Sequence, residues 1–288
     1  MGIFSIWRNA LNLGSKSKNN TTMQKLNVPS SALKRGVSVD IYLPPQYGKE
    51  KNKVYPTVYF NDGQDVARMD MNVMLDSLFS DNKLNETIVV GIYANENRIQ
   101  EYGTAQQADY KNRGSLARQY SDFVVHELMP FIQTQYKSSK DKSNNFIAGF
   151  SLGALSAFDI LWSHPDCFSK VGVFSGSLWW RDRPYDILDP EDGRIMHNIV
   201  RQSSYVDDLK FWFEVGTNDE DEDRNKNGII DAIDDTLDLI DTLAKLGYKP
   251  HADISYNEIE GGEHTVETWQ NIMPQFLQWT QQGIRAEA

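Results

Sequence analysis

The sequence of 288 residues has one cysteine, and this scarcity limits the chemistry that the chain can carry. The single thiol of Cys167 excludes an intrachain disulfide, and it excludes a zinc site made of several thiolates. It leaves the redox compartment open, because one cysteine fits a reducing cytosol as well as an exported protein.

Long apolar runs and an excess of positive charge are also missing. No stretch reaches the roughly 18 consecutive apolar residues of a membrane span, and residues 1–20 lack the basic segment and the cleavage site of a signal peptide. The 29 Lys and Arg are outnumbered by 40 Asp and Glu, which gives a net charge of −11 that would repel a phosphate backbone. We therefore expect no nucleic-acid partner, no membrane partner and, for the chain as given, a cytoplasmic location. A periplasmic or secreted location stays open, since a removed leader would be invisible.

The pattern of apolar residues predicts one α/β domain. A polar, flexible tail is expected over residues 1–22, and no linker or internal repeat divides residues 23–285. Strands that alternate with helices imply a largely parallel sheet with helices on both faces, which binds ligands beyond the carboxyl ends of its strands. Pro130 should kink the first long helix. The expected strands are residues 35–44, 54–60, 86–94, 144–150, 170–176, 209–216 and 251–259, and the expected helices are residues 115–136, 152–162, 229–247 and 265–282.

A GxSxG motif lies between an expected strand and an expected helix, in "AGFSLGA" at residues 148–154. A serine at such a turn adopts a strained backbone, and the flanking Gly149 and Gly153 remove side chains that would clash with the strand and the helix. The hydroxyl is then exposed above the edge of the sheet. The alternative is a chance match in a glycine-rich turn, but the strand and the helix around it favour Ser151 as a nucleophile.

A serine nucleophile needs a base, and one histidine is placed to provide it. His264 follows "EGGE" directly after the last expected strand, so the glycine turn brings it to the edge where Ser151 lies. His197 falls in an expected helix and His251 opens an expected strand, which is typical of surface or packing residues. His164 is too close to Ser151, at the far end of the same expected helix.

The acid that orients the base should follow the preceding strand, because the order in this kind of site is Ser, then Asp or Glu, then His. Asp219 is the first carboxylate beyond the strand "FWFEVG". Asp221 and Asp223 remain alternatives, since a loop can change which residue reaches His264. Glu214 alternates with core residues inside the strand and is a weaker candidate.

A tetrahedral oxyanion needs two backbone N–H donors. We expect one from Leu152, at the start of the nucleophile helix where the helix dipole favours negative charge. The other should come from the loop after the third strand of such a fold, which here reads "FNDGQD", and it is assigned to Gln64, which follows Gly63. The alternative is that Asp62 and Gly63 only make a tight turn, and both can be true.

Several motifs together resemble one family. They are "YLPPQY", "YFNDGQD", "NRIQEYG", "HELMPFIQTQY", "IAGFSLGA", "HPDCFSKVGVFSGSLWW", "GTND" and "GGEH", in this order over about residues 25–282. The chain resembles the "putative esterase" family of α/β hydrolases, which includes S-formylglutathione hydrolases, feruloyl and acetylxylan esterase domains, mycolyltransferases and enterochelin esterases. The resemblance implies an α/β-hydrolase fold and hydrolysis of carboxylic esters without an organic cofactor, with Ser151, Asp219 and His264 as the triad. Ala154 replaces a glycine that many members have, and the long insert after "GTND" leaves Asp221 open as the acid.

Two neighbouring tryptophans, Trp179 and Trp180 in "SGSLWW", follow a strand and should line the pocket. Similar aromatic pairs in the enterochelin-esterase branch favour a bulky or aromatic ester, such as a siderophore trilactone or a feruloyl-type or carbohydrate ester. The alternative is that the indoles are core, an interpretation that suits Trp179 better than Trp180. Arg98 and Glu101 are expected to form a structural ion pair beside the site, and the alternative is that they contact the substrate.

The acidic stretch after the expected strand at residues 209–216 contains "DRNKNGIIDAID", residues 223–234, which fits a calcium loop. Gly228 would supply the sharp turn, and the last position is Asp where EF-hands prefer Glu. The alternative is that these carboxylates only favour the start of the following helix. We expect a structural calcium ion that would neutralise the loop and hold Asp219 toward His264. Its ligands would be Asp223, Asn225, Asn227, the carbonyl of Ile229, Asp231 and Asp234.

The sequence therefore predicts a serine esterase that works through an acyl-enzyme on a small-molecule or carbohydrate-linked ester. The alternative from another class is a non-catalytic, calcium-dependent carbohydrate or siderophore binder on a hydrolase scaffold. The complete set of Ser151, Asp219 and His264 argues against the binder, because a site that no longer reacts has no need of all three groups.

Overall fold

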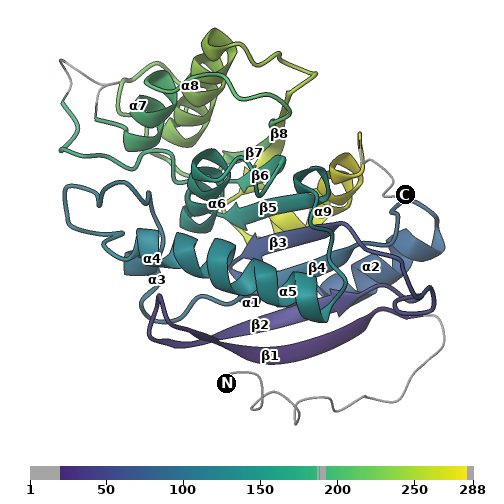
Figure 1. The fold of residues 1–288 in the computed structure, drawn as a ribbon. Helices are drawn as coiled ribbons and strands as arrows, with labels where there is room; N and C mark the ends of the chain where they lie inside the picture. The colour runs from purple at the N-terminus through teal and green to yellow at the C-terminus, as the bar shows by residue number, and fades with distance from the viewer. Residues whose placement is uncertain (1–19, 187, 189–192, 284–288) are drawn as a thin grey trace.

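The computed structural model describes residues 20–186, 188 and 193–283, which form one eight-stranded sheet with helices on both faces (Figure 1). The strands lie in the order β1-β2-β4-β3-β5-β6-β7-β8. They are β1 (Thr22–Ser30), β2 (Arg35–Leu43), β3 (Thr57–Asn61), β4 (Ile88–Ile92), β5 (Asn145–Phe150), β6 (Lys170–Phe174), β7 (Lys210–Asn218) and β8 (Ile254–Glu263). The helices are α1 (Gly63–Arg68), α2 (Met71–Ser80), α3 (Arg98–Glu101), α4 (Ala117–Asp122), α5 (Met129–Gln135), α6 (Leu152–Ser163), α7 (Ile195–Arg201), α8 (Asp231–Leu246) and α9 (Val266–Thr280), with a π-helical turn η1 (Phe123–Leu128) and a 3₁₀ turn η2 (Lys142–Asn144).

The sheet is mostly parallel, as the alternation of strands and helices predicts. Strand β2 pairs antiparallel with both β1 and β4, and every neighbouring pair from β4 through β3 to β8 is parallel. The expected strands and helices all have counterparts. The carboxyl ends of the parallel strands meet at one edge of the sheet, where the turns after β3, β5, β6, β7 and β8 lie together. Residues far apart in the sequence can therefore form one site.

Two hydrophobic clusters fill the two faces of the sheet. One packs against α6, α7, α8 and η1 through residues such as Phe158 and Leu239, and the other packs against α1, α2 and α9 through residues such as Leu75 and Phe276. Strand β7 alternates between them, with Phe213 in the first cluster and Trp212 in the second. Because side chains alternate along a strand, this pattern buries β7 on both faces.

Strand β1 is an edge strand that the sequence pattern did not predict. It pairs with β2 over its whole length, from Thr22 opposite Leu43 to Ser30 opposite Arg35, yet most of its residues are not buried. A solvated edge strand can carry polar residues and a proline such as Pro29, so its sequence resembles a loop. Residues 1–19 of the expected flexible tail, residues 1–22, lie outside the described residues, and Thr22 is the first residue of β1.

The long helix expected over residues 115–136 is divided into α4, η1 and α5. The interruption is a π-helical turn directly before α5, and Pro130 occupies the first turn of α5. The proline lacks an N–H, which the first turn of a helix does not require. The expected single helix is therefore interrupted by a π-helical turn shortly before Pro130.

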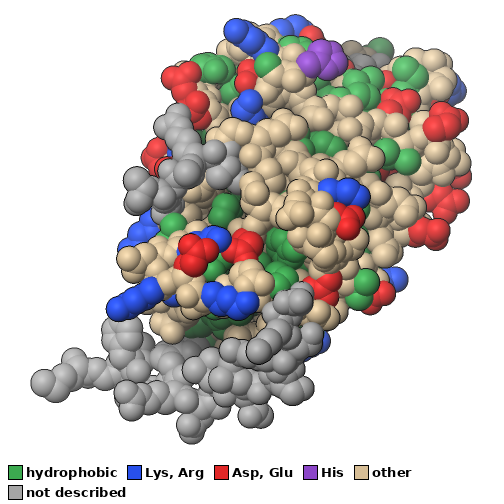
Figure 2. Space-filling view, turned by 90° about the vertical axis from the view of Figure 1, so that its right-hand side faces the viewer, with side chains coloured by type: hydrophobic (Ala, Val, Ile, Leu, Met, Phe, Trp, Pro, Cys, Tyr) green, Lys and Arg blue, Asp and Glu red, His purple; other side chains and the backbone are tan. Residues whose placement is uncertain are grey.

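On the face drawn in Figure 2, hydrophobic side chains form small patches between charged and polar ones. No helix in the described ranges is both long and apolar enough to cross a membrane.

Candidate active site

Ser151 lies at the sharp turn from β5 into α6, with backbone angles φ 54° and ψ −122°. A positive φ is strained for a residue with a Cβ. The turn needs its two glycines for space: a Cβ on Gly149 would lie 2.3 Å from the carbonyl oxygen of Gly153, and a Cβ on Gly153 would lie 2.2 Å from Oδ2 of Asp62. The strand and helix around "GFSLG" thus hold Ser151 half-exposed at the carboxyl edge of the sheet.

The main chain around Ser151 is held by the neighbouring turns. Its N–H donates to the carbonyl of Phe174 at 2.9 Å, and its carbonyl accepts from the N–H of Ser177 at 3.1 Å. The Ser151 hydroxyl lies 3.4 Å from the hydroxyl of Ser177. Among the described residues no hydrogen bond joins Ser151 to His264, and such bonds are often long or poorly aligned without substrate.

The two expected oxyanion donors lie at helix starts. Leu152 is the first residue of α6 and Gln64 is the second residue of α1. The first N–H groups of a helix have no acceptor within the helix, so both are suited to an anion. The Gln64 side chain fixes its own turn, because its Oε1 accepts from the N–H of Ala94 at 3.1 Å and its Nε2 donates to Asp62 at 2.9 Å.

His264 and Asp219 meet at the ends of β8 and β7. The Nδ1 of His264 lies 3.2 Å from Oδ2 of Asp219, whose side chain is 1% exposed while that of His264 is 41% exposed. Ser175 donates to the other oxygen of Asp219 at 3.0 Å and accepts from the indole N–H of Trp269 at 2.9 Å. The Trp269 ring also packs edge-on to His264, with centroids 5.3 Å apart. These contacts fix the plane of the imidazole and leave its Nε2 facing away from the carboxylate.

The other candidate acids are placed differently. Asp221 is exposed, and Asp223 accepts from the backbone of its own loop at Gly228. Glu214 is buried in β7, and burial, together with the nearby charge of Asp219, raises its pKa to about 8. Within the described residues, the carboxylate that contacts His264 is therefore that of Asp219.

The other histidines that the sequence offered as the base lie elsewhere in the structure. His197 is fully buried in α7, its Nε2 lies 2.8 Å from the carbonyl of Asp235, and burial lowers its pKa to about 3. His164 bonds to the hydroxyl of Ser121 at 3.1 Å. His251 lies in an exposed turn with φ 66° before β8, not at the start of the strand as expected.

The two tryptophans take opposite environments. Trp180 is 0% exposed, so the expectation that it lines the pocket is wrong, whereas Trp179 is 37% exposed. The buried indole fits between Gly103 and Gly114, where an added Cβ would lie 3.0 and 3.1 Å from it. The guanidinium of Arg113 lies 4.9 Å from the ring centroid of Trp180 and 5.1 Å from that of Trp179, and it can bind both rings as a cation.

Arg98 and Glu101 do not pair with each other, which corrects the expectation from the sequence. Glu101 pairs with Arg35 of β2, and Arg98 pairs with Asp62 through both carboxylate oxygens. The sequence could not show this choice, because the partners are 66 and 36 positions away.

Ser175 and Ser177 are the site residues that the sequence reasoning missed. Both stand in "FSGS", directly after β6. Their position beyond the end of a parallel strand next to β5 was a usable signal, because neighbouring parallel strands end at the same edge.

The acidic loop after β7 folds around Asp234. The amides of Asn225 and Asn227 each lie 2.8 Å from Oδ2 of Asp234, and Asp223 accepts from the N–H of Gly228 at 2.9 Å. Asp231 instead accepts from the N–H of Arg224 at 2.9 Å and pairs with its guanidinium. Three of the six expected calcium ligands, Asn225, Asn227 and Asp234, thus contact one another, whereas Asp223 accepts from the backbone of the loop and Asp231 faces Arg224.

The family described as "Putative esterase" matches residues 30–280 of the chain. The "Uncharacterized protein YbbA" of Bacillus subtilis (strain 168) is 28% identical over 167 residues, which are 55% of this chain and 66% of YbbA. The "Endo-1,4-beta-xylanase/feruloyl esterase" of Xylanibacter ruminicola is 24% identical over 91% of this chain and 32% of its own length. The chain therefore spans less than two thirds of these two relatives.

Solved structures share the fold at low sequence identity. A ferulic acid esterase superposes with a TM-score of 0.70 at 19% identity, covering 91% of this chain and 98% of that one. The enterobactin esterase FES from Shigella flexneri, in the presence of enterobactin, superposes with a TM-score of 0.71 at 20% identity, covering 91% and 59%. These matches confirm the predicted α/β-hydrolase fold.

Proposed function

We propose that this chain, which belongs to the "Putative esterase" family, is a carboxylic ester hydrolase that cleaves its ester through an acyl-enzyme on Ser151. His264 is the base and Asp219 is the acid that orients it. The observation that carries this proposal is the contact of 3.2 Å between His264 Nδ1 and the buried Asp219 carboxylate, at the same edge of the sheet as the turn of Ser151. A buried carboxylate on Nδ1 fixes the tautomer in which Nε2 can accept a proton.

The reaction follows from these positions. The Ser151 oxygen attacks the ester carbonyl while Nε2 of His264 takes its proton, and the N–H groups of Leu152 and Gln64 stabilise the oxyanion. When the tetrahedral intermediate collapses, His264 returns the proton to the leaving alcohol. Water, activated by the same nitrogen, then releases the acid and restores Ser151.

The substrate that the site favours is a bulky or aromatic ester. Trp179 lies two residues after Ser177 and has an exposed indole beside Arg113. This indole can pack against an aromatic ring or a sugar face of the substrate. Relatives with this fold are named as ferulic acid and enterobactin esterases. We infer that the substrate belongs to the feruloyl-type, carbohydrate-linked or siderophore trilactone esters.

A fluorophosphonate should label the chain on the peptide that contains Ser151. The reagent forms a covalent bond only with an activated serine, so mass spectrometry of the digested protein reads out the nucleophile directly. A heat-denatured sample is the control, because it keeps the sequence but loses the geometry. A folded protein that stays unlabelled would support the alternative, a non-catalytic binder.

We also propose that the loop 223–234 holds a structural calcium ion. Asn225 and Asn227 already contact Asp234, and Asp223 accepts from the N–H of Gly228 in the same loop. Turning the two amides would direct their oxygens toward Asp234, and it would break the bonds that these oxygens now accept from the N–H groups of Asn227 and Ile229. The carbonyl of Ile229 and the carboxylate of Asp231 would complete the set after Asp231 leaves Arg224. Bound there, the cation would offset the repulsion among the carboxylates that follow Asp219.

Calcium should therefore raise the melting temperature, by about 5 °C at a hundredfold excess over the dissociation constant, because it binds only the folded loop. Calorimetric titration and melting curves in calcium and in EDTA measure this. Asp234→Ala should abolish the shift, whereas Asp221→Ala, an exposed carboxylate just outside the loop, should keep it. A flat titration together with equal melting temperatures in calcium and EDTA would refute the site.

A further inference from the structure

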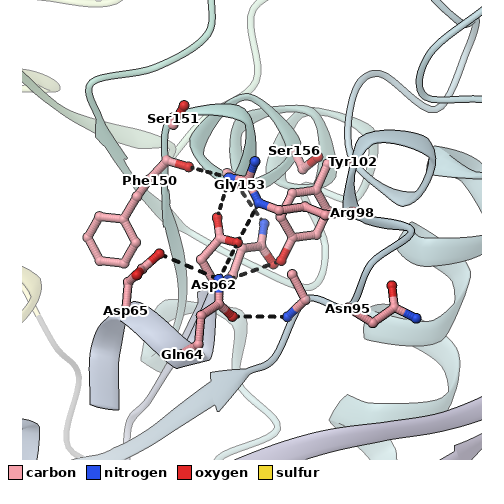
Figure 3. Close-up of polar contacts among 12 residues, drawn as sticks. Asp62, Gln64, Asp65, Asn95, Arg98, Tyr102, Phe150, Ser151, Gly153 and Ser156 are labelled. Carbon is pink, nitrogen blue, oxygen red and sulfur yellow. Dashed lines mark hydrogen bonds and ion pairs between the residues drawn. The ribbon is translucent and has the colours of Figure 1, made fainter. Parts of the chain in front are cut away.

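A bidentate ion pair connects the two turns that carry the expected oxyanion donors (Figure 3). The Nε and Nη2 atoms of Arg98, at the start of α3, donate to the two oxygens of Asp62 at 2.7 and 2.8 Å. The same Nη2 lies 3.3 Å from the carbonyl of Phe150, the residue before Ser151. One guanidinium thus contacts the turn before Gln64 and the turn before Leu152.

The Asp62 turn has an unusual backbone that needs external support. Asp62 has φ 58° and ψ 51°, the left-handed conformation, directly before α1, and its N–H donates to the hydroxyl of Tyr102 at 3.0 Å. Gly63 follows, where a Cβ would lie 2.5 Å from the carbonyl carbon of Gly91. A left-handed aspartate persists only when its surroundings hold it, and Arg98 contacts both oxygens of its carboxylate.

The two turns also touch directly. The side-chain amide of Asn61 donates to the carbonyl of Gly153 at 2.8 Å, and Tyr120 donates to the oxygen of that amide at 2.7 Å. The Asp62 carboxylate packs so closely on Gly153 that no side chain fits there. A movement of Asp62 would therefore displace both donor-bearing turns.

The charge of Asp62 gives the pair a second effect. Its side chain is 0% exposed, while that of Arg98 is 32% exposed. A buried carboxylate between two N–H donors would repel the negative charge that develops on a tetrahedral intermediate. The guanidinium neutralises that carboxylate where it lies, so the donors can act on the oxyanion.

We propose that Arg98 is a positioning residue for the oxyanion hole, which sets the spacing of the Leu152 and Gln64 donors through Asp62 and Phe150 and neutralises Asp62 between them. This inference rests on the proposed function of Ser151. Arg98 acts on the reaction through its two neighbours and need not touch the substrate.

Arg98→Gln should lower kcat for an activated aryl ester about 100-fold, with KM changed less than about threefold, because a misplaced oxyanion donor acts in the transition state. The matched control is Arg35→Gln. Arg35 also donates to both oxygens of a buried carboxylate, that of Glu101 at the other end of α3, and its Nε lies 2.8 Å from Oε1. Unlike Arg98, it contacts neither of the turns that carry the oxyanion donors. The Arg35→Gln variant should lower the melting temperature about as much as Arg98→Gln does, and its kcat should stay within about threefold of the wild-type value.

Asp62→Asn in the Arg98→Gln background gives a second measurement, because asparagine tolerates the left-handed backbone and removes the unpaired charge. The double variant should be about tenfold more active than Arg98→Gln alone. If Arg98→Gln does not fold, Arg98→Lys replaces it, and its kcat should fall at least about tenfold, since an ammonium cannot bridge both oxygens and the Phe150 carbonyl.

Two results would overturn the inference: a folded Arg98 variant with the kcat of Arg35→Gln, or a double variant no more active than Arg98→Gln. Fluorophosphonate labelling of the wild-type protein separates this failure from that of the proposed function. An unlabelled Ser151 would remove the function itself, whereas a labelled Ser151 with an indifferent Arg98 would remove only the role of Arg98.

Discussion

Replacing Ser151 by alanine should lower kcat for an activated aryl ester by about 10⁴- to 10⁶-fold, the loss typical of a deleted serine nucleophile. Without the hydroxyl no acyl-enzyme forms, and the remaining rate comes from the oxyanion donors and from binding alone. Steady-state kinetics with an aryl acetate measures the loss, and fluorophosphonate labelling should vanish with it. The fold should persist, since alanine keeps the Cβ and removes only a half-exposed hydroxyl that lies 3.4 Å from Ser177.

Ser163→Ala is the matched control for that change, because Ser163 is an exposed serine at the other end of α6. Its kcat and its labelling should equal those of the wild-type protein. Turnover by a folded Ser151→Ala variant at the wild-type rate would end the assignment of the nucleophile.

Replacing Asp219 by asparagine should lower kcat by about 10⁴-fold, the loss expected when the base is held in the wrong tautomer. The new amide can donate to Nδ1 of His264, which moves the imidazole proton to Nε2 and prevents that nitrogen from accepting the proton of Ser151. The substitution keeps the shape of a side chain that is 1% exposed and that Ser175 now bonds at 3.0 Å. Kinetics and a melting curve on the same sample separate loss of function from loss of fold.

Asp221→Asn is the control, and it also decides between the two acids that the sequence left open. Asp221 is exposed and two residues away, so its variant should keep at least about half of the wild-type kcat. A larger loss in Asp221→Asn than in Asp219→Asn would reverse the assignment and imply that the loop rearranges when substrate binds.

The layout of the sheet was predictable because it is encoded locally. Runs such as "NFIAGF" and "KFWFEVG" are buried on both faces and bounded by turns, so their strands could be recognised without knowing their neighbours. Strand β1 escaped recognition because an edge strand is stabilised by its pairing with β2 and needs no apolar pattern of its own.

The sequence by itself determined the order of the motifs, the glycines around Ser151 and the family, because each depends on a few neighbouring residues or on their order along the chain. Only the tertiary structure decided which carboxylate contacts His264, which tryptophan is buried and which acid Arg98 binds. His264 is 45 positions from Asp219 in the sequence, and Arg98 is 36 positions from Asp62. Several side chains of suitable chemistry stand near each end of such a pair along the chain, and the three-dimensional packing of the described residues decides which of them comes within bonding distance.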